Sequence, residues 1–222
     1  MIHYGFELMV RPRKGWQTIA ELPDSLIKAL SLYPFFLAAF PSLAWYFGTS
    51  QIGWTVGNSN VVTRLTEVSA IELSLMFYAA MVLAVAIIGY SIHWMSETYG
   101  AESTVTRGIV ISALACTPLF VAGTVGLYPL LWLDFFIGII ALAWAVYLLY
   151  LGIPIVMKIP QERGFLFSSA IVAIALVMFV CILVVSILLW VVEGGSEKQI
   201  FVATQNNCLA LHSTPINTIT FE

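Results

Sequence analysis

Long apolar runs constrain this chain more than any other feature of its sequence. Five of them are long enough to cross a bilayer as helices, which takes about 20 residues each. They occupy residues 26–47, 70–94, 109–127, 130–151 and 165–192. Only 9% of the 222 residues are charged, against roughly 25% in soluble domains. The sequence therefore predicts an all-α, polytopic transmembrane bundle of about five helices.

The count of five depends on the boundary between the third and fourth runs. Only Tyr128 and Pro129 separate them, and a tight turn there makes the two helices antiparallel neighbours. The alternative is one very long span, giving four in all, which the combined length and the proline disfavour. Prolines at Pro34, Pro41 and Pro118 predict kinks or breaks inside the first and third runs.

Basic residues set the orientation, because Lys and Arg concentrate in cytoplasmic segments of membrane proteins. With the N-terminus inside, seven of them lie on the cytoplasmic side and two on the opposite side. The seven are Arg11, Arg13, Lys14, Lys28, Arg107, Lys158 and Arg163, and the two are Arg64 and Lys198. The sequence therefore predicts a cytoplasmic N-terminus and, with five spans, a C-terminus outside.

Residues 1–25 are predicted to form a cytoplasmic segment that contains a short interfacial helix at 11–25. Trp16, Ile19 and Leu22 lie on one side of that helix, and its basic residues are expected at the anionic head groups. It is either an anchor that flanks the membrane or a helix on which a partner docks.

Residues 26–192 are predicted to be the transmembrane domain. The polar string EGGSEK at 193–198 follows it. We expect residues 193–222 to be a loosely ordered extramembrane tail.

Ionisable side chains inside spans are costly, so each is a candidate functional residue. Glu72 and His93 lie in the second run and Asp134 in the fourth. Steps of four and three residues join Glu72 and His93 along one helix face, which also holds Met76, Ala79, Leu83, Ala86 and Tyr90. The same steps from Asp134 give Gly138, Ala141, Ala145, Leu148 and Gly152.

Small residues on both faces favour close helix packing in lipid, so both faces are expected to turn inward. The helix-packing positions expected are Ala79, Ala86, Gly138, Ala141 and Ala145. Glu72 and Asp134 would lie at similar depth, where two carboxylates can bind a cation or share a proton. Alternatively, each is solvated at the interface or bonded to a neighbour such as Ser69 or Arg64.

Other chemistry finds little support in the sequence. His93 and Glu97 are spaced to share a metal, but His3 and His212 do not complete a site, so a structural His93 is expected. The three cysteines form no CxxC or Cys/His cluster, and no HExxH, GxSxG or P-loop motif occurs. We therefore expect no catalytic site, metal or cofactor. The net charge of -3 does not suggest a nucleic-acid partner.

Five strings follow one another in an order typical of a known family. They are GTSQIGW at 48–54, TPLF at 117–120, LYPLLW at 127–132, YLLYLGIP at 147–154 and ERGFLFSS at 162–169. Through them the chain resembles the bacterial YohC-like branch of the Yip (Ypt-interacting protein) family over roughly residues 12–190. The resemblance implies a five-helix bundle in the bacterial inner membrane, with a cytoplasmic N-terminus. It implies no defined chemistry, since bacteria lack the Rab-type GTPases that eukaryotic relatives bind.

The string at 147–154 can also be interpreted physically. Tyr147 and Tyr150 are expected at the cytoplasmic interface, and Gly152 and Pro154 are expected to end the fourth span. The alternative is a binding role for a loop at 153–164.

Two functions follow from these observations. The favoured one is a non-enzymatic protein that binds or organises membrane components, with lipid, other membrane proteins or a second copy as partners. The alternative is a small permease or ion-coupled carrier that uses Glu72 and Asp134, although a carrier is expected to have more polar residues in mid-span.

Overall fold

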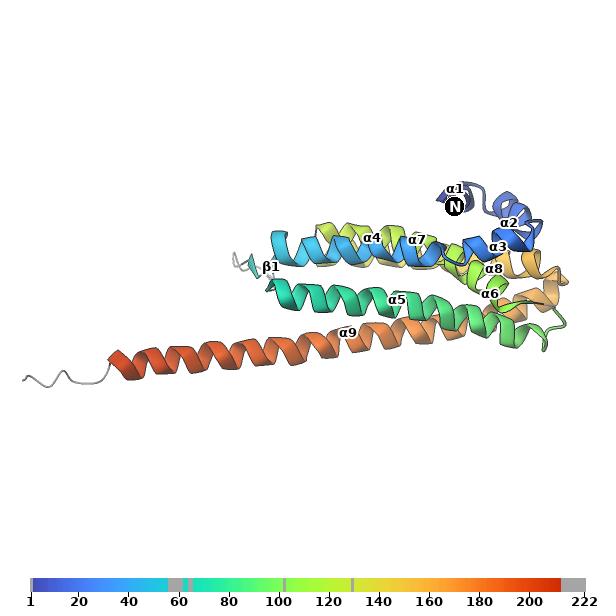
Figure 1. Ribbon diagram of the computed structural model, residues 1–222. Coiled ribbons are helices and arrows are strands. Elements are labelled where there is room, and N and C mark those ends of the chain that lie inside the picture. Colours follow the sequence, from blue (N-terminus) through green and yellow to red (C-terminus); the bar gives the residue numbers. More distant parts are fainter. Residues whose placement is uncertain (1, 56–61, 64–65, 102, 129, 213–222) are drawn as a thin grey trace, which may run out of the picture. The chain divides into compact units, whose positions relative to one another are not determined.

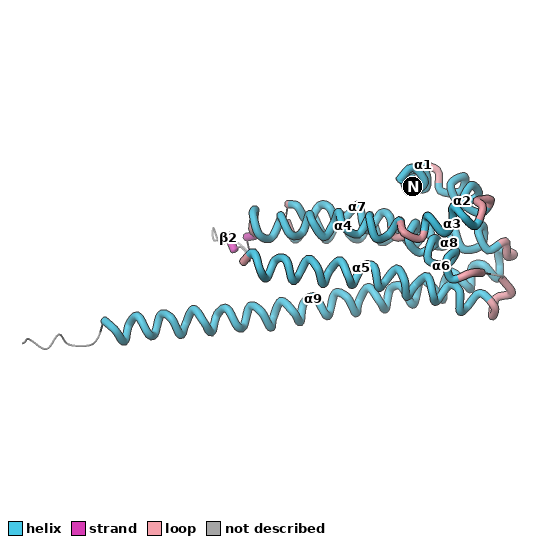
Figure 2. Tube along the Cα trace, in the orientation of Figure 1, coloured by secondary structure: helices cyan, strands magenta, loops and turns pink. Residues whose placement is uncertain are grey.

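Helices make up nearly all of the chain that the computed structural model describes, which is residues 2–55, 62–63, 66–101, 103–128 and 130–212 (Figures 1 and 2). The chain divides into two compact units, Met1–Met178 and Phe179–Glu222. The α-helices are α1 Ile2–Val10, α2 Pro12–Ala20, α3 Asp24–Leu30, α4 Tyr33–Phe47, α5 Glu67–Ser96, α6 Val105–Ala115, α7 Thr117–Gly123, α8 Leu131–Met157 and α9 Gln161–His212.

Four short elements accompany these helices in the described part of the chain. A π-helical turn, Gly48–Ile52, extends α4, and a 3-10 turn, Thr124–Leu127, extends α7. Two strands of two residues each, β1 Trp54–Thr55 and β2 Val62–Thr63, pair antiparallel between α4 and α5. The predicted all-α polytopic class is confirmed.

The predicted spans correspond to helices in the structure. Four segments are long and apolar enough to cross a membrane. They are Asp24–Ile52, Glu67–Ser96, Trp132–Met157 and Gln161–Val185. Val105–Ala115 and Thr117–Leu127, bent by 44° at their junction, make a fifth if they are one broken span. The α7 and α8 helices pack together, as expected for neighbours joined by a tight turn, although Pro129 itself lies outside the described residues.

Prolines mark two breaks in these spans. Pro34 and Pro118 each lie in the first turn of a helix, α4 and α7, where the missing N–H has no helical partner to lose. The α-helix is interrupted just before each of them, at residues 31–32 and at Cys116, and the second interruption is the one with the 44° bend. Pro41 lies inside α4, and the helix continues through it to Phe47. The first and third spans are therefore broken, as predicted, but not at Pro41.

The α5 and α6 helices begin at threonine caps. Thr66 accepts a hydrogen bond from the Ser69 N–H at 3.4 Å, and Thr104 accepts one from the Arg107 N–H at 3.4 Å. Each bond satisfies a backbone donor that a helix start leaves without a partner. Each cap therefore fixes where its helix begins at the rim of the bundle.

The α2 helix corrects one part of the prediction for residues 11–25, which is what covers the apolar side of the helix. The helix exists, but Trp16 and Ile19 are buried and belong to the core, and Leu22 is partly buried against it. The indole of Trp16 lies on α8 at Gly152, where a Cβ would come within 2.6 Å of the ring. A glycine leaves this part of α8 flat enough to receive the indole, so the protein, and not the head groups, covers the apolar side of α2.

The α9 helix corrects the prediction for the tail. It continues through the EGGSEK string at 193–198 to His212, where no regular structure was expected. Adding a residue to a formed helix is far easier than starting one, so two glycines weaken the helix without ending it. The extramembrane position of residues 193–222 stays a prediction, and residues 213–222 lie outside the described part of the chain.

Candidate functional site

Glu72 lies five residues into α5, and its side chain is exposed. The face predicted to turn inward with it turns outward instead. Leu83 and Tyr90 are 59% and 58% exposed, Ala79 is exposed, and Ala86 is only half-buried. The opposite face of α5 is the packed one, and it includes Ala70, Val85, Ile88, Gly89 and Ile92. The sequence could not distinguish these faces because α5 is apolar all round.

Asp134 lies in the first turn of α8, and its side chain is half-buried. Beyond it the predicted α8 face becomes buried, at Ala141, Ala145, Leu148 and Gly152. Gly138 is different, because a Cβ there would have no atom within 4 Å. The start of this face, at Gly138, is therefore open, and its C-terminal half packs closely.

The structure does not bring Glu72 and Asp134 together. The α5 helix packs mainly on α4 and α6, whereas α8 packs mainly on α2, α6 and α7. Among the described residues, no hydrogen bond or ion pair involves either carboxylate, and Arg64 lies outside that set. A shared cation or proton site between α5 and α8 thus has no geometric support.

His93 joins the C-terminal end of α5 to the segment before α6. Its Nδ1 lies 2.8 Å from the carbonyl oxygen of Ser103, and its own carbonyl accepts a bond from the Ser96 hydroxyl at 2.6 Å. Because a carbonyl only accepts, Nδ1 carries the proton. Glu97 is exposed, and no group of three potential metal ligands occurs in the described ranges.

The family string at 147–154 is the junction of three helices. Tyr150 of α8 places its hydroxyl 2.9 Å from the Ser169 hydroxyl of α9 and its ring beside Phe165. Gly152 receives Trp16 of α2, and Tyr147, on the exposed side, lies against Trp144. Tyr150 therefore connects α8 to α9, and Gly152 connects α8 to α2, at the end predicted to be cytoplasmic.

The predicted end of the fourth span is wrong by about one turn. The α8 helix passes Gly152 and contains Pro154, then ends at Met157. Lys158, with a φ of 53°, closes it by donating its backbone N–H to the Pro154 carbonyl. The loop expected at 153–164 is accordingly short, since α9 begins at Gln161. The Pro154 ring lies against Gly164 of α9, where a Cβ would leave no room for it.

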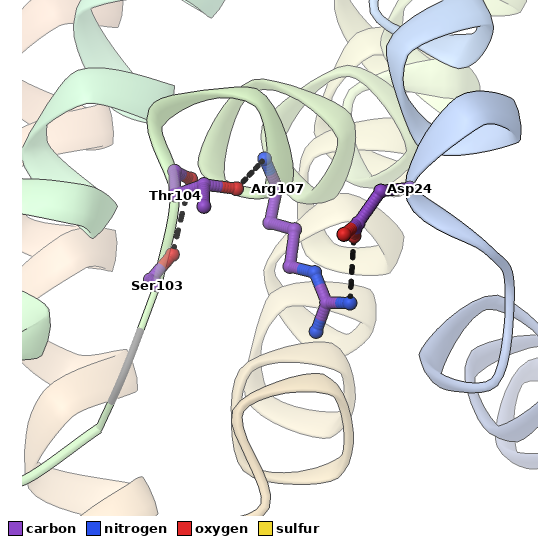
Figure 3. Close-up of polar contacts among 4 residues, drawn as sticks. All are labelled: Asp24, Ser103, Thr104 and Arg107. Carbon is purple, nitrogen blue, oxygen red and sulfur yellow. Dashed lines mark hydrogen bonds and ion pairs between the residues drawn. The ribbon is translucent and has the colours of Figure 1, made fainter.

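Sequence reasoning missed several polar contacts between helices, and two of them involve the starts of the first and third spans or the breaks within them. Arg107 at the start of α6 donates to Asp24 at the start of α3, with 3.1 Å between Nη2 and Oδ1 (Figure 3). The hydroxyls of Tyr33 and Thr117 lie 3.4 Å apart, both buried, at the breaks in the first and third spans. The prolines at positions 34 and 118 mark both breaks, but nothing in the sequence shows that they face each other.

Comparison with known proteins gives a family match. The Yip1 domain matches residues 6–182. Inner membrane protein YohC of Escherichia coli strain K12 is 33% identical over 183 residues, which cover 82% of this chain and 93% of that protein. The protein of the same name from E. coli O6:H1 gives the same values. No solved structure matches significantly.

Proposed function

Because the chain belongs to the Yip1 family, as a multi-pass protein of the inner membrane, we propose that it binds or organises other membrane components without catalysing a reaction. Two polar side chains of its spans support this proposal, because their hydrogen bonds are made within the protein. His93 bonds to the backbone of the α5–α6 connection, and Tyr150 bonds to α9. Both interactions join elements of the protein to one another, so these polar groups have a structural role.

One observation carries the proposal, and it is the uncovered surface of α5. Only 11% of its most apolar stretch is buried inside the protein, against 39% for α8. The uncovered side holds a small residue, Ala79, between the polar residues Glu72 and Tyr90. Small and polar residues favour contact between helices in lipid. We infer that this side of α5 receives a helix of another membrane protein or of a second copy.

Site-specific photo-cross-linking in native membranes tests this proposal. A cross-linker in place of Ala79 is expected to give a defined adduct. Ile140 of α8, which is also exposed, is the matched control and is expected to give lipid adducts only. Purification in mild detergent should retain the partner that the adduct identifies. A bare monomer with no specific lipid, recovered under several conditions together with no adduct at position 79, would overturn the proposal.

A further inference from the structure

The α1 helix is held to the bundle along one side. Gly5 and Leu8 are buried, and a Cβ on Gly5 would meet the Tyr33 hydroxyl and, at 3.3 Å, the Thr117 side chain. Tyr33 lies nine residues into the spanning segment Asp24–Ile52. The α1 helix therefore lies beside a spanning segment, and not beyond its end (Figure 1).

The other side of α1 exposes large apolar side chains at this depth. Phe6 is 68% exposed and Val10 is 62% exposed, and the two are one helical turn apart. Because Gly5 and Leu8 fix the rotation of the helix, neither of these side chains can turn toward the bundle. Something apolar outside the protein must cover them if they are to leave water.

Positive charge follows these apolar residues directly. Arg11, Arg13 and Lys14 are exposed, and none of them forms an ion pair in the described ranges. The nearby carboxylate of Glu7 lies 3.9 Å from His3, and that of Asp24 binds Arg107. Large apolar side chains beside unpaired basic residues are the composition of a helix that lies in an anionic lipid interface.

We propose that α1 and the start of α2 bind the anionic surface of the cytoplasmic leaflet. Phe6 and Val10 insert among the acyl chains, and Arg11, Arg13 and Lys14 contact the head groups. The inserted residues thus come from α1, whereas Trp16 and Ile19 of α2 anchor the segment to the protein. This inference rests on the proposed function and names one membrane component, anionic phospholipid, that the protein binds.

Fluorescence quenching on the full chain in nanodiscs tests this inference. All three native cysteines are replaced by serine, and Phe6→Cys carries an environment-sensitive fluorophore. Phe36→Cys on α4 is the lipid-facing control, and Thr98→Cys in the α5–α6 connection is the aqueous control, since both positions are exposed. Size-exclusion profiles establish that each variant is folded. Lipid-borne nitroxide and dissolved iodide then report which medium surrounds the label.

In phosphatidylglycerol nanodiscs, the Phe6→Cys label is expected to be quenched by lipid nitroxide like the Phe36→Cys label and shielded from iodide. Replacing Arg11, Arg13 and Lys14 by glutamine should lower the ratio of lipid-inserted to water-exposed label roughly fivefold per neutralised charge at low salt. Nanodiscs of neutral lipid should lower the same ratio. Iodide access equal to that at Thr98→Cys, or quenching independent of lipid charge, would overturn the inference.

Shielding from both quenchers would show that protein covers α1, and it would also overturn the inference. None of these outcomes depends on the adduct at position 79. A failure of lipid binding by α1 is therefore distinguishable from a failure of the proposed function.

Discussion

Gly108 of α6 lies directly against the backbone carbonyl of Gly89 in α5. A Cβ on Gly108 would collide with that oxygen, and a Cβ on Gly89 would come within 2.6 Å of the Ile109 Cα. One turn further along α6, the Ser112 hydroxyl donates across the interface to the Val85 carbonyl at 2.8 Å. The two helices therefore meet backbone to backbone, which is how helices pack tightly in lipid.

Replacing Gly108 by valine should separate α5 from α6. We expect a loss of about 1–3 kcal/mol in the free energy of unfolding, because the added atoms force the backbones apart. Unfolding by sodium dodecyl sulfate in mixed micelles measures this value. Gly138→Ala is the control, since its Cβ meets open space, and it should gain about 0.5–1 kcal/mol through helix propensity. Equal effects at both positions would contradict the close contact.

Trp16→Ala should be among the most damaging single substitutions. Removing a buried indole costs about 3–5 kcal/mol, whereas Trp132→Ala, at a position that is 76% exposed, should cost far less. Trp16→Phe is expected to cost much less than Trp16→Ala. The indole N–H is buried with no hydrogen-bond partner in the described residues, so its removal also removes an unsatisfied donor. Thermal unfolding of the purified variants compares the three.

The hydroxyl bond between Tyr150 and Ser169 should couple α8 to α9. Tyr150→Phe and Ser169→Ala each remove the 2.9 Å contact, and each should cost about 0.6–1.7 kcal/mol. The double variant should cost less than the sum, because both changes delete the same interaction. A double-mutant cycle measures the difference, and strict additivity would mean that the bond contributes nothing.

The Arg107–Asp24 pair should contribute little and depend on salt. It lies at the rim of the bundle with the Asp24 side chain mostly exposed, and such pairs contribute at most about 1 kcal/mol. Asp24→Asn should therefore destabilise slightly at low ionic strength and have no effect at high ionic strength. Glu21→Gln is the control, because Glu21 is exposed and outside both described ion pairs. A salt-independent loss at Asp24 would indicate a role other than the ion pair.

The spans could be predicted because bilayer thickness imposes a minimum length and an apolar composition on them. The breaks at Pro34 and Pro118 could also be predicted from the sequence, since a proline inside a helix removes a backbone hydrogen bond. Pro41 and Pro154 show the limit of that rule. Each lies inside a helix that continues past it, and each ring lies beside a glycine of another helix, Gly123 for Pro41 and Gly164 for Pro154.

The orientation of helix faces could not be predicted from one chain segment alone. The inward side of α5 is selected by Gly89, whose partner Gly108 lies on another helix. Trp16 was expected on the apolar side of an interfacial helix because an interfacial tryptophan and a core tryptophan look alike in sequence, and only Gly152 on α8 distinguishes them. For the same reason, no spacing rule could show that α5 and α8, which carry Glu72 and Asp134, are not major packing partners of each other.

The packing of Trp16 against Gly152 also implies an order in which the helices assemble. Trp16 leaves the ribosome before any span exists, whereas Gly152 belongs to α8. At translation rates of about 5–20 residues per second, the indole waits roughly ten seconds for its partner. During that interval the binding site for the indole on α8 does not yet exist. Docking of α2 is thus a late step of biogenesis, because it requires a residue of α8 that is synthesised 136 positions after Trp16.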